Sequence, residues 1–531
     1  MFMTWAGWRV CSRLAVAGLT LGALIAAAPA VSASAGGPVA GPVAGTANGP
    51  VRGLANGTVD EFLGIPYAAP PVGALRWQPP QPAASWSGVR DATQFAPHCP
   101  QLGGPFGLAS TSEDCLFLNV FTPSHGTARA GHPVMVWIHG GALVTGESDD
   151  YAPAGLVADG VTVVTINYRL GALGFLAHPA LADAKGQSGD YGLMDQQAAL
   201  RWVQRNIAGF GGNPNHVTIF GESAGGLSTL SQVASPQARG LFERAIVESG
   251  SYNLTQASLA SAETAGEAFA TKAGCAGQTA ACLRSLPVSA ILANQDAAGY
   301  TPNINSAVLP ESLGTAFATG NFNRVPIING TNRDEWRLFV ALSELEGNPV
   351  TAANYQSMIS ATLGVPAAAA AIIAAKYPLT AFLSPSVALG AVGTDAIFAC
   401  PALTIDQSVS RFVPTFAYEF NDENAPELFL PPVSFPYGAA HASEIQYVMD
   451  LPTAVFGKAL SAPQQRLATI MKGYWTNFAK GGFPSSFGAS FWPLFNGLIQ
   501  PIQSLIPPTP RTETNLASAH NCVFWTALEA A

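Results

Sequence analysis

The chain has 531 residues, of which 48% are hydrophobic and only 11% are charged, and its formal net charge is −9. This composition predicts a large buried core and excludes a mainly disordered protein. The acidic balance argues against nucleic acid or an anionic membrane surface as a partner, because both repel negative charge. No linker or fixed-period repeat divides the sequence after its N-terminal stretch, so we expect a single domain over residues 49–531.

The N-terminal stretch has the features of a secretory signal. Two arginines precede the apolar run Leu14–Ala28, and an A-x-A-like cleavage site follows at Ala33–Ala35. A membrane anchor is the alternative, but the apolar run is short for a span and small residues follow it. We therefore expect a signal peptide over residues 1–35, export from the cell without a stable membrane anchor, and a flexible Gly/Pro/Ala-rich arm over residues 36–48.

The cysteines agree with export. Cys11 lies inside the expected signal, and the six that remain are an even number, which in an oxidising compartment suggests three disulfides. Closeness in sequence favours the pairs Cys99–Cys115 and Cys275–Cys282, and this leaves Cys400–Cys522 to hold the C-terminus. The sequence has no C-x-x-C motif, so we expect neither a zinc site nor a redox site, and no metal.

Farther along the chain, prolines between residues 66 and 82 exclude helix and leave short strands and loops. Apolar, β-rich runs then predict strands, several of them buried on both faces. These runs are 116–121, 133–139, 161–168, 217–220, 245–247, 325–330 and 415–420. Leu193, Leu200, Val203 and Ile207 form one apolar stripe of a helix between two of the runs. Strand, helix and strand in this order predict an α/β fold with a central, mostly parallel sheet flanked by helices.

The segment Gly221–Gly225 (GESAG) matches the motif G-x-S-x-G and directly follows the strand expected at 217–220. In this motif a sharp strand-to-helix turn exposes the serine oxygen, and the glycines leave room for the turn. The helix that follows directs its N–H groups toward the place where an oxyanion would form. A structural turn is the alternative in a glycine-rich chain, but the buried strand before the motif favours Ser223 as a nucleophile.

The segment His139–Ala142 (HGGA) is a glycine turn at the carboxyl end of the strand expected at 133–139. Open α/β sheets place their sites at that edge, and an H-G-G turn can supply backbone N–H groups to an oxyanion hole. The signal is weak by itself, because many turns use Gly-Gly, and it gains weight beside the serine motif.

In this architecture an acid and then a histidine follow the serine along the chain. Two histidines follow Ser223, namely His441 and His520. His520 lies two residues before Cys522 in a tail that a disulfide is expected to hold, so the order favours His441 as the general base. A plain surface histidine in the small-residue loop 436–444 is the alternative.

The acid is expected in the loop that follows the strand at 325–330. Asp334 and Glu335 both lie there, and one carboxylate would hold the imidazole in its useful tautomer. The residues alone do not choose between the two, and a solvated charged loop is the alternative.

These motifs, in this order, resemble the type-B carboxylesterase and cholinesterase family of α/β-hydrolases, from about Phe62 to Trp525. The matching segments are Phe62–Pro71 (FLGIPYAAPP), Ser112–Asn119 (SEDCLFLN), Trp137–Ala142 (WIHGGA), Asn167–Leu176 (NYRLGALGFL), Gly192–Gln196 (GLMDQ), Gly209–Gly226 (GFGGNPNHVTIFGESAGG), Val247–Gly250 (VESG) and Cys522–Trp525 (CVFW). The resemblance implies an α/β-hydrolase fold with helical insertions, which we place at about 251–320 and 337–410. It also implies a serine carboxylesterase that needs no cofactor and acts on small-molecule esters.

The resemblance implies a role for each site residue. Ser223 would be the nucleophile, Glu335 the acid and His441 the base. The backbone N–H groups of Gly141, Ala142 and Ala224 would form the oxyanion hole, and Glu222 resembles a buried carboxylate beside the triad. The disulfides Cys99–Cys115, Cys275–Cys282 and Cys400–Cys522 match family positions, and the pairs Arg76 with Glu113 and Arg169 with Asp195 resemble internal ion pairs.

The chain departs from the family pattern at two places. Trp336 replaces a glycine after the acid, and the loop between Cys99 and Cys115 has Phe106 as its only aromatic residue. Cholinesterases use an aromatic residue in that loop to bind quaternary ammonium, so choline esters are not expected as substrates. A lipase with a lid near this loop or near 425–436, and a non-catalytic adhesion or binding protein, are the alternatives to a carboxylesterase.

Overall fold

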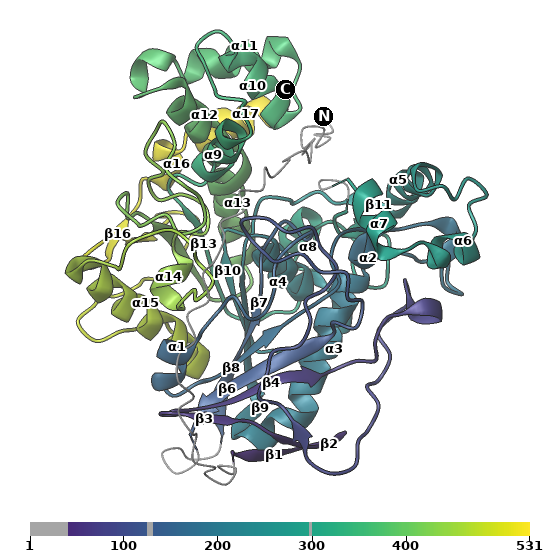
Figure 1. Cartoon of the computed structure of the whole chain (residues 1–531). Coiled ribbons are helices and arrows are strands. Elements are labelled where there is room, and N and C mark those ends of the chain that lie inside the picture. Colours follow the sequence, from purple (N-terminus) through teal and green to yellow (C-terminus); the bar gives the residue numbers. More distant parts are fainter. Residues whose placement is uncertain (1–40, 125–130, 297–299, 531) are drawn as a thin grey trace, which may run out of the picture.

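The computed structural model describes residues 41–124, 131–296 and 300–530 (Figure 1). The expected signal peptide and the first part of the expected arm lie outside these residues. An eleven-stranded sheet forms the centre of the molecule, in the order β16-β15-β14-β13-β10-β9-β7-β8-β6-β4-β3. All pairs from β15 to β8 in this order are parallel, and the pairs toward both edges are antiparallel.

The strands of the central sheet are β3 (Leu54–Asn56), β4 (Val59–Pro66), β6 (Phe117–Pro123), β7 (His132–Ile138), β8 (Thr162–Ile166), β9 (Gly212–Glu222), β10 (Arg244–Glu248), β13 (Ile327–Asn332), β14 (Thr415–Phe420), β15 (Ile502–Leu505) and β16 (Arg511–Glu513). The expected strands are confirmed, and most of their ends agree to within two residues. β9 starts five residues earlier than expected, and β13 is shifted by two residues, so that it ends at Asn332 in the segment expected as a loop.

The helices are α1 (Ala154–Ala158), α2 (Gly171–Phe175), α3 (Tyr191–Asn206), α4 (Ala224–Ala234), α5 (Leu259–Lys272), α6 (Ala280–Ser285), α7 (Val288–Asn294), α8 (Leu313–Thr319), α9 (Arg337–Leu345), α10 (Tyr355–Leu363), α11 (Ala367–Lys376), α12 (Pro385–Gly393), α13 (Cys400–Val409), α14 (Ile445–Val448), α15 (Ala462–Gly481), α16 (Leu516–Ala519) and α17 (Cys522–Ala530). A π-helical turn, η6 (Thr394–Ala399), joins α12 to α13. In Figure 1, α9 to α12 gather with α17 above the sheet, and α5 to α7 lie together at another side.

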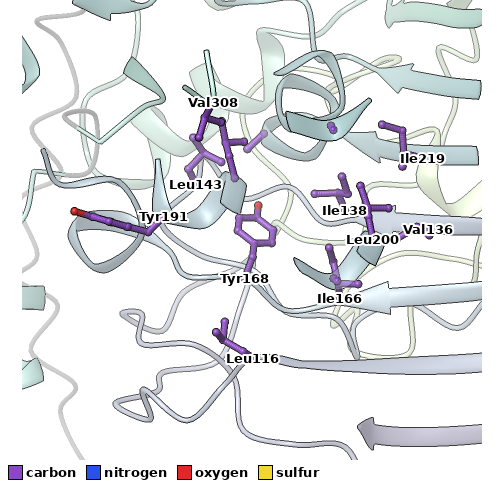
Figure 2. Close-up of a cluster of buried hydrophobic side chains, with 14 of the residues drawn as sticks. Leu116, Val136, Ile138, Leu143, Ile166, Tyr168, Tyr191, Leu200, Ile219 and Val308 are labelled. Carbon is purple, nitrogen blue, oxygen red and sulfur yellow. The ribbon is translucent and has the colours of Figure 1, made fainter. Parts of the chain in front are cut away.

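The two faces of the sheet are covered by different helices, because successive side chains of a strand point to opposite faces. On β7, Val134, Val136 and Ile138 join a core cluster that contains residues of α3 and α4. Met135 and Trp137 of the same strand join a second cluster that contains residues of α15. Figure 2 shows part of the first cluster, with side chains that come from several strands and from α3. A third cluster lies within the helical region α9 to α13 and includes α17.

The expectation of a loose arm over 36–48 is wrong for its last part. Val43–Thr46 forms strand β1, which pairs antiparallel with β2 (Gly49–Arg52), and β2 pairs in turn with β5 (Arg90–Asp91). The Thr46 hydroxyl donates a hydrogen bond to the Gly49 carbonyl oxygen, 2.6 Å away, and closes a tight hairpin. The N–H of Ala47 donates to the side chain of Asn206 at the end of α3, which ties the hairpin to that helix.

Three disulfides join the cysteines in the expected pairs, Cys99–Cys115, Cys275–Cys282 and Cys400–Cys522. The expected internal ion pairs are present as well: Arg76 contacts Glu113, and Arg169 contacts Asp195 at 2.7 Å. A second small sheet pairs β11 (Ala257–Ser258), which precedes α5, with β12 (Asn303–Ile304), which follows α7.

Among the described residues, the helical run Pro385–Val409 is long and apolar enough to cross a membrane, and 78% of its most apolar window is buried inside the protein. The pair α10 and α11 passes the same test together, but it is bent by 113°. Burial of most of its surface is the property of a core helix, so the run Pro385–Val409 belongs to the interior of the fold.

Candidate active site

Ser223 stands at the sharp turn between β9 and α4. Its backbone has φ 56° and ψ −120°, a conformation that side chains rarely adopt and that strained functional turns use. Its N–H donates to the Glu248 carbonyl oxygen at 2.9 Å, and its carbonyl oxygen accepts from Leu227 at 2.8 Å. From Val217 to Ser235, Ser223 is the one residue that is not fully buried. The turn therefore presents the serine, and nothing else of this segment, to the outside.

The glycines of the motif allow the elbow to pack against β7. A Cβ atom added to Gly221 or to Gly225 would overlap the carbonyl oxygen of Ile138, the last residue of that strand. Larger residues at either position would push the serine turn away from the strand that leads into the H-G-G-A turn.

The H-G-G-A turn lies directly against the elbow. A Cβ atom on Gly140 would come within 2.9 Å of the Glu222 side chain and 3.2 Å of the Ser223 Cβ. Gly141 and Ala142 both have positive φ, 94° and 54°. In the part of the chain that the structure describes, the N–H groups of Gly141 and Ala142 donate no hydrogen bond, and the N–H of Ala224 is among the unpaired first donors of α4. These N–H groups are available for an external acceptor.

His441 contacts Glu335 and not Asp334. Its Nδ1 lies 2.5 Å from Glu335 Oε2, and its backbone N–H donates to the Glu335 carbonyl oxygen at 3.3 Å. The other carboxylate oxygen of Glu335 accepts from the Thr331 hydroxyl at 2.9 Å and from the Asn332 N–H at 2.7 Å. The side chain of Glu335 is completely buried. These two donors on Oε1 leave Oε2 directed toward the imidazole.

Asp334 points elsewhere, although it is the neighbour of Glu335. It forms an ion pair with Arg337 at 2.8 Å and accepts a hydrogen bond from the Ala439 N–H at 3.0 Å. Its role is to connect two loops, the one after β13 and the one that carries His441.

The second imidazole nitrogen of His441 is open. Nε2 is buried without a hydrogen-bond partner among the described residues, so it is not hydrogen-bonded to the Ser223 hydroxyl. The nearest ion-pair partner is Oε1 of Glu222, 3.2 Å away, which also lacks a hydrogen bond. Hydrogen bonds of catalytic groups are often long or misaligned before substrate binds.

Buried carboxyl groups surround His441. Burial raises the pKa of Glu222 well above its usual range, that of Glu248 to about 8 and that of Glu444 to about 7. Burial lowers the pKa of His441, but the charges of Glu222 and Glu335, the hydrogen bond with Glu335 and the charge of Glu444 together raise it to about 9. The surroundings thus favour positive charge on the imidazole, which is the form that a general base reaches during the reaction.

Nothing in the local sequence indicates Glu248 as a site residue, and little indicates Glu444. Glu248 ends β10 and is the register partner of Glu222 on β9, so the parallel pairing brings the two together. The Trp475 indole N–H donates to Glu248 at 3.0 Å. Glu444 follows His441 by three residues and accepts a hydrogen bond from the Asn332 side chain. The spacing from His441 was the one signal in the sequence that could have indicated Glu444.

Aromatic side chains form a wall beside His441. The rings of Phe339 and Phe398 lie 5.2 and 5.0 Å from the imidazole, measured between centroids. Trp336, which departs from the family pattern, is buried and lies 4.4 Å from the Phe339 ring. Trp336 therefore supports these two rings by packing against Phe339.

The loop between Cys99 and Cys115 contacts the segment 425–436, which was the other possible place for a lid. The ring centroids of Phe106 and Phe429 lie 5.5 Å apart.

One cluster among the described residues, His98, Glu147 and Asp149, brings potential metal ligands close together. Nε2 of His98 lies 2.9 Å from Asp149, and Nδ1 lies 3.3 Å from Glu147. Each imidazole nitrogen thus faces a carboxylate, and the arrangement is explained as a group of ion pairs.

The chain matches known carboxylesterases over nearly its whole length. The model of the carboxylesterase family matches residues 40–525. Human cocaine esterase is 36% identical over 506 residues, which are 88% of this chain and 87% of that protein. Fumonisin B1 esterase of Sphingopyxis macrogoltabida is 35% identical over 460 residues, 83% of this chain and 82% of its own.

The fold matches solved structures of the same family. A thermophilic PNB esterase superposes with a TM-score of 0.78 at 32% identity and covers 92% of this chain and 99% of its own. A PNB esterase superposes with a TM-score of 0.76, also at 32% identity, and covers 90% of this chain and 98% of its own. The large, mostly parallel sheet, the helices around it and these matches agree, and the chain belongs to the carboxylesterase family of carboxylic ester hydrolases.

Proposed function

We propose that this protein is a secreted serine carboxylesterase that hydrolyses esters of short to medium acyl chains through Ser223, His441 and Glu335. The observation that carries the proposal is the orientation of His441. Glu335 occupies Nδ1 at 2.5 Å, and Nε2 is left without a hydrogen bond, 3.2 Å from Oε1 of Glu222, the residue before Ser223. A proton on Nδ1 and a free lone pair on Nε2 make the tautomer that a general base needs.

In the first half of the reaction, the Ser223 Oγ attacks the ester carbonyl carbon while Nε2 of His441 takes the hydroxyl proton. The carbonyl oxygen becomes negative and is bound by the N–H groups of Gly141, Ala142 and Ala224. When the tetrahedral intermediate collapses, the bond to the alcohol oxygen breaks. The imidazolium gives its proton to the departing alcohol, and the acyl group remains on Ser223.

In the second half, water takes the place of the alcohol. Nε2 of His441 accepts a proton from the water, whose oxygen attacks the acyl carbon, and the oxyanion is bound as before. Collapse of this intermediate breaks the bond to Ser223, and the imidazolium returns its proton to Oγ. The released carboxylic acid and the restored serine complete one turnover.

The preference for short to medium chains is supported by the aromatic wall at the base. Phe339 and Phe398 contact the imidazole from one side, and Trp336 stands behind them. Rigid rings next to the reacting carbon leave limited room for a long acyl chain. Export is supported by the three disulfides, which form and persist in oxidising compartments.

The test is hydrolysis of p-nitrophenyl esters from acetate to palmitate by the protein and by Ser223→Ala. Ser231→Ala is the matched control, because Ser231 lies on α4, the helix that begins directly after Ser223, and, among the described residues, its hydroxyl bonds only to the Leu227 carbonyl oxygen. We expect loss of turnover in Ser223→Ala alone, and rates that fall beyond medium chains. Strong activity on palmitate that rises above the solubility limit would instead indicate a lipase, and full activity of Ser223→Ala would refute the proposed nucleophile.

A further inference from the structure

His520, the second histidine after Ser223, is held between two carboxylates in the interior. Its Nδ1 lies 2.6 Å from Asp395 Oδ1, and its Nε2 lies 2.5 Å from Glu419 Oε1. Its side chain is 7% exposed. Both nitrogens can donate to a carboxylate only when the ring is a cation. Burial lowers the pKa of His520, but the hydrogen bonds and charges of Asp395 and Glu419 raise it to about 10.

The two carboxylates belong to different parts of the fold. Asp395 lies in the π-helical turn η6, and its other oxygen accepts from the Tyr377 hydroxyl at 2.6 Å. Glu419 lies on β14, and its other oxygen accepts from the Asn421 side chain at 2.7 Å. His520 therefore fastens η6 to the central sheet. The disulfide Cys400–Cys522 holds the chain beside it, because Cys400 directly follows η6.

The turn η6 contacts the proposed catalytic histidine, His441. Phe398, three residues after Asp395, lies with its ring 5.0 Å from that of His441. Thr394, at the start of η6, accepts a hydrogen bond at 3.0 Å from the N–H of Trp336, the residue that follows Glu335. A π-helical turn is rare, occurs often at functional sites, and needs surrounding contacts to persist.

The strand β14 pairs with the strand that orients the proposed acid, Glu335. Glu419 is the register partner of Thr331 on the neighbouring strand β13. The Thr331 hydroxyl donates to Glu335 at 2.9 Å. Of the two carboxylates that His520 joins, Asp395 thus lies on η6, which contacts His441. Glu419 lies on β14, which is the neighbour of the strand that orients Glu335.

We propose that His520 is a positioning residue for ester hydrolysis: by joining Asp395 to Glu419 it holds η6, and with it Phe398, in place against the ring of His441. The inference rests on the proposed function, because it acts through His441. Without the imidazolium, two buried carboxylates would be left without a positive partner between them, and that is strongly destabilising. Asp395 would then move toward solvent, because a buried charge without a partner is unfavourable. This would displace η6, and the Phe398 ring would move with it.

The test compares His520→Gln with His178→Gln. His178 is a matched control, since it is also buried and faces one neutral side chain, Gln278, at 2.8 Å. Both variants are measured for thermal midpoint, for kcat and KM on p-nitrophenyl acetate and octanoate, and for the pH dependence of kcat/KM. We expect His520→Gln to lower kcat by about 10- to 100-fold, because small misplacements of catalytic groups cost that much. We also expect it to change the ratio of the acetate and octanoate rates.

Two further variants keep the test decisive. Tyr377→Phe removes one hydroxyl, which donates to Asp395 and accepts from the Trp525 indole and the Asn521 side chain. It keeps His520 in place, so it should fold if His520→Gln does not, and it should change the same ratio in the same direction. Phe398→Leu completes a double-mutant cycle: in its background, His520→Gln should lose most of its effect on the ratio, because the two residues act through one contact.

Two results would overturn the inference. One is an unchanged acetate-to-octanoate ratio and pH profile in His520→Gln and Tyr377→Phe, with only a lower thermal midpoint, as for His178→Gln. The other is strict additivity with Phe398→Leu. Activity that persists in Ser223→Ala would refute the proposed function itself, so the two failures are distinguishable.

Discussion

The carboxyl group of Glu222 should control the pH at which the enzyme becomes active. In the proposed mechanism His441 must be neutral to accept the Ser223 proton, so kcat/KM should rise with pH through the pKa of His441, which its surroundings raise to about 9. Glu222 Oε1 lies 3.2 Å from His441 Nε2. Replacing Glu222 by Gln removes a negative charge that stabilises the imidazolium. The pKa of His441 should therefore fall, and the acidic limb of the profile should move to lower pH.

The size of the shift follows from the distance. A full unit charge 3.2 Å away contributes about 5 kcal/mol at an effective dielectric constant of about 20, which corresponds to about 4 pH units. Burial raises the pKa of Glu222 well above its usual range, so this carboxyl group is charged for only part of the time and the effect is smaller. We expect a shift of about 1 to 3 units, the usual range for a close charge.

The assay is the pH dependence of kcat/KM on p-nitrophenyl acetate, for the protein and for Glu222→Gln. Asp406→Asn serves as the control: Asp406 is also buried, but it hydrogen-bonds Asn329 and is not among the charges that act on His441. Because Glu222 and His441 titrate together, the apparent pKa read from the acidic limb belongs to the pair. The shift of this apparent pKa is the quantity to compare between the variants. A limb that stays in place or moves to higher pH in Glu222→Gln would refute the reasoning.

The remaining predictions concern the acid and the disulfides. Glu335→Gln should lower kcat by about 10⁴-fold, because an amide no longer favours the proton on Nδ1; Asp334→Asn, whose side chain faces another partner, should retain most activity, and equal losses would contradict the assignment. Alanine replacement of the Cys400–Cys522 disulfide, with a sequence separation of 122, should cost about 5 kcal/mol of unfolding free energy. Replacement of Cys275–Cys282, with a separation of 7, should cost about 2 kcal/mol, and thermal midpoints in the opposite order would contradict this entropic account.

Local patterns in the sequence determine much of the fold. The strands at 133–139 and 415–420 were predictable because a strand buried on both faces needs a continuous apolar run, which a short window of sequence displays. The serine turn was predictable for a similar reason. The strained turn packs so closely against β7 that positions 221 and 225 must be glycine. Both glycines lie within two residues of the serine, so a short window of sequence shows the requirement. Strand β1 in the expected arm could not be predicted from local composition, because it depends on a hairpin bond and on Asn206, far along the chain.

The tertiary structure alone decided how distant side chains meet. Asp334 and Glu335 are neighbours of similar chemistry, and the family resemblance, not the residues themselves, selected Glu335; the loop geometry turns one toward Arg337 and the other toward His441. The buried carboxyl group of Glu248 became visible only through the register of β9 and β10. His520 lies more than 100 residues from both of its partners. Such contacts follow from strand register and chain crossing, which no local window of sequence contains.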